Sequence, residues 1–324
     1  MHSVLEEIGK IGIVPVIKID DAEKAVPLAQ ALQAGGIPCI EITFRTAEGE
    51  KAIQHIARAM PEMLAGAGTV LTTDQVDRAI NAGAKFIVSP GFNPKVVAYC
   101  TKKGIPITPG CANPSDIEQA LEFGLQTVKF FPAEQAGGIE YIKAIAAPYP
   151  NVQFIPTGGI NAGNIGKYLS FEKVIACGGS WMAGANLINA GEFDKITALS
   201  REAVLKVLGF SVAHIGINAA RDEAAMKAAQ QFNALFGFTL KDGTSSIFAG
   251  DAIEAVKTSA PGTHGHIAIG TNSITRAAAY LERNGIVFDY ANAKKDNLGN
   301  TIAVYFTEEI LGFAVHLLQM KNRE

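Results

Sequence analysis

A lysine lies in the middle of a short apolar segment, TVKFFP, at residues 127–132. Burial within a strand favours the neutral amine of Lys129, which is the form that attacks a ketone. A second apolar segment, CIEITF at residues 39–44, carries Glu41, whose carboxylate needs a partner or a proton when it is buried. This pair predicts Schiff-base catalysis by Lys129, with Glu41 as general acid/base. A purely structural ion pair between them is the alternative.

Short apolar segments of the same kind recur roughly every twenty to twenty-five residues, with amphipathic stretches between them. They begin at Ile13, Cys39, Met63, Lys85, Pro106, Thr127, Val152 and Lys173. Continuous apolar strands separated by helices indicate a parallel sheet covered by helices, and eight such units close a (β/α)8 TIM barrel. The fold class is therefore α/β, and residues 1–209 are predicted to form the barrel.

Polar groups at the helix starts are expected to be N-caps, namely Asp20–Asp21, Thr73–Asp74 and Ser115. In a TIM barrel, the residues that carry chemistry lie at the carboxyl ends of the strands, where the loops converge on one face. The groups expected there are Glu41, Arg45, Thr69, Pro90, Lys129, Gly158–Gly159 and Gly178–Gly179–Ser180.

Arg45 has a permanently charged planar fork that suits a substrate carboxylate, although an ordinary surface ion pair is a competing role. The two glycine-rich stretches follow the seventh and eighth expected strands. TIM barrels commonly bind phosphate at these two loops through free backbone N–H groups. The predicted substrate is therefore an acid that also carries phosphate.

The pattern changes near Gly209, where FSVAHIGIN from Phe210 alternates and strands begin to follow one another without helices. Residues 210–324 contain two similar units, each with a strand, a helix and further strands. The first unit begins at VAHIGIN and the second at GHIAIGTN. We expect a small α+β domain of paired βαβββ units.

Composition excludes several classes of protein. The 324 residues carry 28 Lys and Arg against 31 Asp and Glu, a net charge of −3, so no basic surface for nucleic acid is expected. The four cysteines show no metal-ligand spacing. The N-terminal segment is not basic like a secretory signal, and no apolar stretch reaches membrane length. A cytoplasmic protein without a membrane partner is predicted.

The segments CIEITFRT, GAGTVLT, FIVSPG, PITPG, VKFFPAEQAGG, PTGGI and GGSW occur in this order. Together they resemble the 2-keto-3-deoxy-6-phosphogluconate (KDPG) aldolase family, which includes 4-hydroxy-2-oxoglutarate (KHG) aldolases, over about residues 5–208. The resemblance implies a homotrimeric class I aldolase that needs no cofactor. It also implies Lys129 as Schiff-base former and Glu41 as acid/base.

The resemblance further implies how the substrate is held. Arg45 and Thr69 contact the pyruvate end, Pro90 and Phe131 line the pocket, and Gly158, Gly159 and Ser180 hold the phosphate. The partner is then a small phosphorylated keto acid. Cleavage of KDPG to pyruvate and glyceraldehyde 3-phosphate is expected, with cleavage of 4-hydroxy-2-oxoglutarate to pyruvate and glyoxylate as a second reaction. Aldolase activity in the galactonate series is the alternative, since it differs only in stereochemistry.

The C-terminal region resembles the glyoxalase and vicinal-oxygen-chelate superfamily, whose paired units place metal ligands on the first and last strand of each unit. The matching positions are His214, Glu254, His266 and His316. His316 stands where that superfamily usually has a glutamate that also acts as base. A divalent metal is the cofactor this implies, since imidazole suits zinc and nickel. Metal-dependent isomerase or dioxygenase activity, ligand sensing and mere packing remain alternative roles for this domain.

Overall fold

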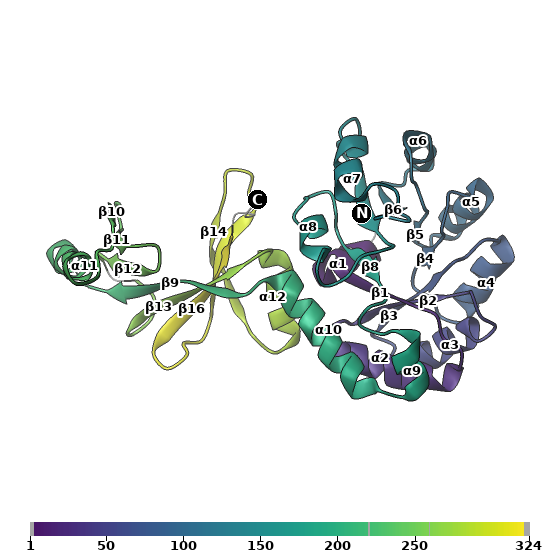
Figure 1. Ribbon diagram of the computed structural model, residues 1–324, viewed down its shortest axis with the longest axis horizontal. Coiled ribbons are helices and arrows are strands. Elements are labelled where there is room, and N and C mark those ends of the chain that lie inside the picture. Colours follow the sequence, from purple (N-terminus) through teal and green to yellow (C-terminus); the bar gives the residue numbers. More distant parts are fainter. Residues whose placement is uncertain (1–2, 220, 259, 321–324) are drawn as a thin grey trace. The chain divides into compact units, whose positions relative to one another are not determined.

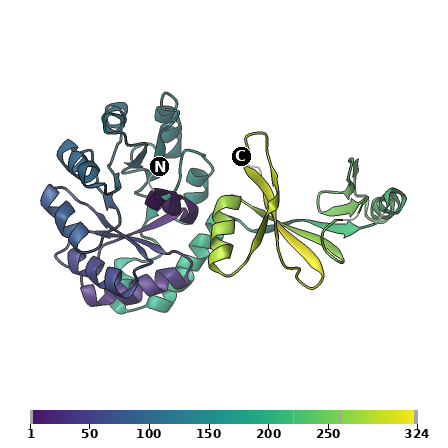
Figure 2. The ribbon, with the colours of Figure 1, turned by 180° about the vertical axis from the view of Figure 1, so that it is seen from behind.

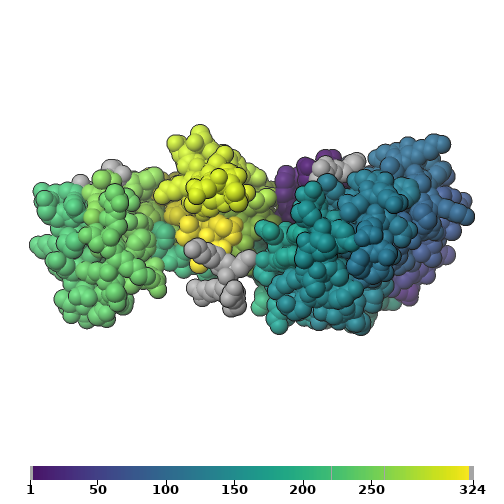
Figure 3. Space-filling model, turned by 90° about the horizontal axis from the view of Figure 1, so that it is seen from above, coloured from purple at the N-terminus to yellow at the C-terminus, as the bar shows by residue number. Residues whose placement is uncertain are grey.

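The computed structural model describes residues 3–219, 221–258 and 260–320. The chain divides into two compact units, Met1–Val207 and Leu208–Glu324. In Figure 3 the first unit runs from purple to teal and the second from green to yellow. No helix among the described residues is long and apolar enough to cross a membrane.

The first unit is a parallel α/β structure with strands inside and helices outside (Figure 1). Its strands are β1 Ile13–Ile17, β2 Cys39–Thr43, β3 Leu64–Gly68, β4 Ile87–Val88, β5 Ile107–Thr108, β6 Thr127–Phe130, β7 Gln153–Pro156 and β8 Cys177–Gly179. Six form one sheet in the order β5-β4-β3-β2-β1-β8, and β6 pairs with β7. Isolated parallel bridges, Gly110 to Lys129 and Thr157 to Gly178, join the two sheets into a ring. The predicted parallel α/β architecture is confirmed.

The helices of this unit surround the strands, as Figure 2 shows from behind. They are α1 Ser3–Ile11, α2 Ala25–Ala34, α3 Gly49–Ala59, α4 Thr73–Asn81, α5 Pro94–Lys103, α6 Pro114–Glu122, α7 Gly138–Ala146, α8 Ile165–Leu169, α9 Ala185–Ala190 and α10 Phe193–Leu208, with a 3-10 turn η1 at Ala22–Lys24. Each helix from α1 to α9 buries apolar residues of one face, such as Ile53 and Ile56 in α3. That burial, at about 25 cal/mol per Å² of apolar surface, holds the helical layer on the strands.

Two expected helix caps are wrong by one or two residues. Thr72 caps α4, with its hydroxyl accepting from the backbone N–H of Gln75, so Thr73 is already inside the helix. Asn113 caps α6 in place of Ser115. The reason is Pro114, whose fixed φ favours the first helical position and leaves the residue before it as the cap. Asp21 caps η1 as expected.

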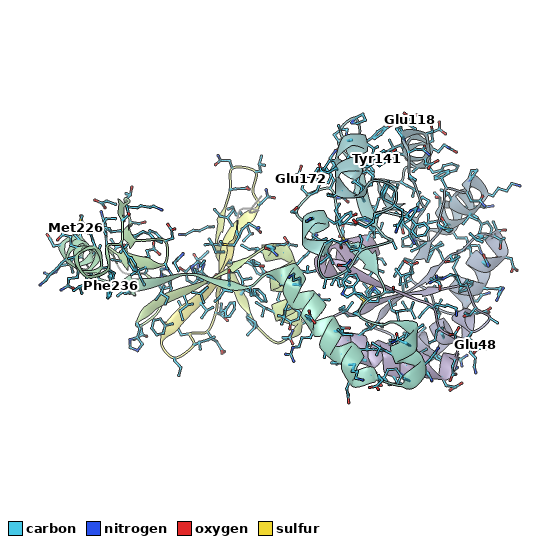
Figure 4. All side chains as sticks on the ribbon, viewed as in Figure 1. Glu48, Glu118, Tyr141, Glu172, Met226 and Phe236 are labelled. Atoms are coloured by element: carbon cyan, nitrogen blue, oxygen red, sulfur yellow. The ribbon has the colours of Figure 1, made fainter. Side chains whose placement is uncertain are left out.

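Alternation along β6 directs its side chains to opposite layers. Phe130 packs against Tyr141 of α7, which is labelled in Figure 4, with ring centroids 5.8 Å apart. Lys129, the preceding residue, therefore points to the other side, into the ring of strands. Both residues are buried, so the outward aromatic contact holds the strand in the register that places the amine inside.

The second unit contains two successive strand–helix–three-strand modules. The first comprises β9 Ser211–Asn218, α11 Asp222–Phe236, β10 Leu240–Asp242, β11 Ser246–Ala249 and β12 Ile253–Val256. The second comprises β13 Gly265–Thr271, α12 Ile274–Arg283, β14 Phe288–Lys295, β15 Thr301–Phe306 and β16 Phe313–Gln319. All eight strands form one sheet in the order β10-β11-β12-β9-β13-β16-β15-β14. The modules meet where β9 pairs antiparallel with β13.

Candidate active site

The amine of Lys129 and the carboxylate of Glu41 meet inside the strand ring. Lys129 Nζ lies 3.6 Å from Glu41 Oε1, and the two side chains are only 8% and 4% exposed. Oε1 of Glu41 has no hydrogen-bond partner among the described residues. The ring of Phe131 lies 5.3 Å from the lysine Nζ. A buried carboxylate with an open lone pair beside a buried amine is well placed to exchange protons with a ligand on that amine.

Gly68 makes room for Glu41, and sequence reasoning did not predict this role. A Cβ at Gly68 would lie 2.1 Å from Glu41 Oε1, although Gly66, two residues earlier on β3, is the residue directly opposite Glu41. Gly66, on the same strand, leaves space for the ring of Phe86 in the same way. A glycine inside a strand often marks a position where another group approaches closely. The two glycines in the LAGAG segment of β3 could therefore have indicated this role from the sequence.

The interior around the pair is nearly filled. A cavity of about 10 Å³ is lined by Lys129 and Glu41 together with Thr108 and Thr157. This is about the room that one water molecule needs, and the walls offer several polar partners for it. A substrate must therefore reach Lys129 from the strand ends, where the remaining predicted site residues lie.

Arg45 and Thr69 follow the carboxyl ends of β2 and β3. The guanidinium Nε of Arg45 donates to Thr43 Oγ1 at 3.1 Å, and this hydroxyl donates to the Ile17 carbonyl at 2.8 Å. Thr43 is buried while Arg45 is exposed, so the hydroxyl orients a charge at the rim of the barrel. Thr69 has φ of 58°, a strained conformation for a β-branched residue. Strain of this kind is concentrated at functional sites.

The other predicted residues also follow strand ends on this side of the ring. Pro90 follows β4, Phe131 follows β6, Gly158 and Gly159 follow β7, and Ser180 follows β8. Both glycines have positive φ, 104° and 76°, and a Cβ at Gly159 would lie 2.6 Å from that of Glu134. Only glycine fits this turn comfortably. The structure brings Lys129 into contact with Glu41 and Phe131, and it places the others on neighbouring loops.

The second unit brings four predicted ligands together. Nε2 of His214 and Nε2 of His266 lie 3.2 Å apart, and Glu254 Oε2 lies 3.2 Å and 3.0 Å from them. His316 joins the two other histidines, with ligand atoms of all three within 4.8 Å of one another. A tetrahedral zinc ion with ligands at about 2.0–2.2 Å holds neighbouring donors roughly 3.3–3.6 Å apart. The spacing and the donor types therefore fit a divalent ion.

Two small residues separate these ligands across the sheet. Gly216 pairs with both Glu254 and His266, and a Cβ there would lie 2.0 Å from the His266 ring. Ala268 pairs with both His214 and His316. Side chains at directly opposite positions stand on the same face, so a larger residue at either position would push the ligands apart.

The electrostatics of this cluster favour a neutral imidazole at His316 and an ionised carboxylate at Glu254. Burial lowers the pKa of His316 to about 4, and its Nδ1 lies 3.2 Å from the Leu317 carbonyl. Burial tends to raise the pKa of Glu254, but hydrogen bonds from His214, His266 and Ser246 outweigh it and hold this pKa well below its usual range. Nδ1 of His266 is buried without a partner among the described residues. The cluster lies against a cavity of about 780 Å³.

The first unit is a class I aldolase, a carbon–carbon lyase with a buried lysine amine inside a parallel α/β barrel. The family model of KDPG and KHG aldolase matches residues 4–199. The chain belongs to this family.

Known relatives agree with the assignment. The chain is 49% identical over 209 residues to the 2-dehydro-3-deoxy-phosphogluconate aldolase of Treponema pallidum, which covers 64% of this chain and 99% of that protein. It is 44% identical over 192 residues to the KHG/KDPG aldolase of Escherichia coli, covering 59% of this chain and 90% of that protein. The KDPG aldolase of Legionella pneumophila has been solved with pyruvate captured as a covalent carbinolamine intermediate. It is 40% identical to this chain, with a TM-score of 0.60, and the match covers 62% of this chain and 97% of that protein.

Proposed function

We propose that the chain cleaves KDPG to pyruvate and glyceraldehyde 3-phosphate through a Schiff base on Lys129. The observation that carries the proposal is the buried Lys129 amine 3.6 Å from the Glu41 carboxylate. The pyruvate carbinolamine of the Legionella relative supports the same chemistry. We also propose that this chain cleaves 4-hydroxy-2-oxoglutarate, because the relative from Escherichia coli is named for both substrates.

The steps follow from these two groups. The Lys129 amine attacks the C2 ketone, and Glu41 transfers protons as the carbinolamine loses water to give an iminium. Glu41 then removes the C4 hydroxyl proton, and the C3–C4 bond breaks with its electrons flowing into the iminium. Glyceraldehyde 3-phosphate leaves, and protonation and hydrolysis of the remaining enamine release pyruvate and the free amine.

The loops around the strand ends supply the binding contacts. Arg45 and Thr69 hold the pyruvate carboxylate, and Pro90 and Phe131 line the pocket. The phosphate binds at Gly158, Gly159 and Ser180.

Aldolase activity in the galactonate series is less favoured as the main reaction, since the solved structure named KDPGal is only 27% identical to this chain. The homotrimer remains a prediction that sedimentation of the purified protein would test.

The proposal is tested by trapping. The protein is incubated with pyruvate and sodium borohydride, digested and analysed by mass spectrometry for a reduced pyruvate adduct. An adduct on the tryptic peptide that contains Lys129 supports the mechanism. An adduct on another lysine, or none while cleavage of KDPG proceeds, would contradict it.

Thr43 is predicted to position Arg45. Replacing Thr43 by valine keeps the buried volume but removes the acceptor for the Arg45 guanidinium, a charged hydrogen bond with a net value of about 1.5–3 kcal/mol. KM for KDPG should rise about tenfold or more while kcat changes little, because Arg45 binds the carboxylate in the ground state and the transition state alike. Steady-state kinetics measure this. Thr43→Ser should restore KM, and a fall in kcat alone would contradict the role.

We further propose that the second unit binds a divalent metal ion through His214, Glu254, His266 and His316. Three histidines with ligand atoms within 4.8 Å of one another, and Glu254 beside two of them, lie against a large cavity, which favours this role over packing alone. Such an ion would supply Lewis-acid chemistry at the cavity. The role of this unit is then decided by what happens to a ligand that binds there. Conversion of the ligand to a product indicates isomerase or dioxygenase activity, and binding without conversion indicates ligand sensing.

Gly216 offers a test of this site without removing a ligand. In Gly216→Ala, the added methyl group collides with the His266 ring, so affinity for Zn²⁺ or Co²⁺ should fall about 10–100-fold. Titration of the metal-free protein with Co²⁺, followed by absorbance, measures the affinity. Gly166→Ala is the matched control, since its added methyl meets nothing within 4 Å. Equal affinity in the two variants would contradict the proposed site.

A further inference from the structure

We propose that Asn161 and Asn164 position the loop after β7, so that the N–H groups of Gly159 and Ile160 face the substrate phosphate. The inference rests on the aldolase function proposed above, in which this loop holds the phosphate. It adds two positioning residues and one further N–H donor, that of Ile160. The evidence is a set of hydrogen bonds that hold two consecutive carbonyl groups of the loop.

The carbonyl group of Gly159 is held by two side-chain amides. It accepts hydrogen bonds from Nδ2 of Asn164 at 3.1 Å and from Nδ2 of Asn161 at 3.3 Å. In a trans peptide bond, such as this one, the N–H of the next residue points opposite to the carbonyl. The N–H of Ile160 therefore points away from the two asparagines, and within the described part of the chain it has no hydrogen bond.

The preceding carbonyl group, that of Gly158, is held from the segment after β6. The backbone N–H of Glu134 donates to it at 3.1 Å, and the carboxylate of Glu134 accepts from the hydroxyl of Tyr168 on α8. The N–H of Gly159 therefore points away from Glu134, and it too has no hydrogen bond among the described residues. Successive free N–H groups in a turn of this kind form a concave site that suits an anion.

The orientation of both asparagine amides is fixed by their oxygen atoms. Oδ1 of Asn164 accepts from the backbone N–H of Asn161 at 2.8 Å, and Oδ1 of Asn161 accepts from that of Gly163 at 2.8 Å. Only the oxygen of an amide accepts from an N–H, so Nδ2 of each residue is the atom that faces the Gly159 carbonyl. Tyr168 is buried in α8, so Asn164 extends from a firmly packed element.

The two asparagines act through the loop, because they lie on the opposite side of it from the free N–H groups. Without them the peptide between Gly159 and Ile160 is free to rotate, and rotation turns a carbonyl oxygen toward the phosphate in place of an N–H. This loss weakens phosphate binding in the ground state and the transition state alike, so it raises KM with little change in kcat. Pyruvate carries no phosphate, so its reaction with Lys129 does not depend on the loop.

The experiment compares Asn164→Ala with Asn151→Ala in the full chain. Asn151 is the matched control, because it is exposed and precedes β7, at the other end of the strand from the loop. Asn164→Ala should raise KM for KDPG about tenfold, since two hydrogen bonds of its side chain are lost, with little change in kcat. The pyruvate concentration that gives half-maximal borohydride trapping on Lys129 should keep its parental value. Asn151→Ala should match the parental protein in both measurements.

Equal KM values for the Asn164→Ala and Asn151→Ala proteins would overturn the inference. A matching rise in the pyruvate concentration needed for trapping would also overturn it, since the whole barrel would then be disturbed. If Asn164→Ala does not fold, Asn161→Ala removes the other donor to the same carbonyl and should raise KM for KDPG about threefold, whereas an unchanged KM would contradict the role. A parental protein that traps no pyruvate on Lys129 would refute the aldolase proposal itself, and this inference with it.

Discussion

Replacing Lys129 by arginine is expected to reduce kcat for KDPG cleavage by about 10⁴-fold or more. The guanidinium places a positive charge beside Glu41 but is not a nucleophile at neutral pH, so the covalent route is lost. Borohydride trapping with pyruvate should give no adduct on the site peptide. Both are measured with a coupled assay for pyruvate release and by mass spectrometry.

A matched control separates chemistry from folding. Lys143→Arg changes a half-exposed lysine that pairs with Glu140 on α7, so it should retain parental activity. Thermal unfolding of Lys129→Arg and Lys143→Arg, followed by circular dichroism, shows whether either change disturbs the fold. Substantial KDPG cleavage by a folded Lys129→Arg protein would contradict the Schiff-base assignment.

Replacing Glu41 by glutamine should lower kcat about 10²–10⁴-fold, which is the usual contribution of a general acid/base. The amide has nearly the same size but neither accepts nor releases the proton that C3–C4 cleavage requires. KM should change much less, because the binding contacts belong to the loops around Arg45 and Gly158. Borohydride should still trap pyruvate on Lys129 after longer incubation, since the amine remains.

Glu172→Gln is the control for this change, because Glu172 is an exposed carboxylate of the same unit (Figure 4). It should have parental kinetics. A Glu41→Gln protein with unchanged kcat would favour the alternative raised from the sequence, that Glu41 and Lys129 form only a structural ion pair. Loss of folding in Glu41→Gln, seen as a lowered melting temperature, would point to the same alternative.

Much of the barrel unit was predictable because its signals are local. A buried parallel strand must be apolar throughout, so the eight segments stand out between amphipathic stretches, and each observed strand falls within a predicted one. Lys129 and Glu41 are conspicuous for the same reason, since a charged residue within such a strand requires a chemical or structural explanation. The helix starts were less certain, because Asn113 before Pro114 and the neighbouring Ser115 are both good caps.

The sequence by itself determined the residue types that carry chemistry and the order of the strands that hold them. Only the tertiary structure decided which backbone positions give those side chains room. Gly68 admits the side chain of Glu41 from the neighbouring strand. Strand register places Gly216 opposite Glu254 and His266, and it places Ala268 opposite His214 and His316. Register depends on pairing between segments far apart in the chain, and no local pattern encodes it. The site is therefore predictable in its chemistry, while its geometry is a property of the folded sheet.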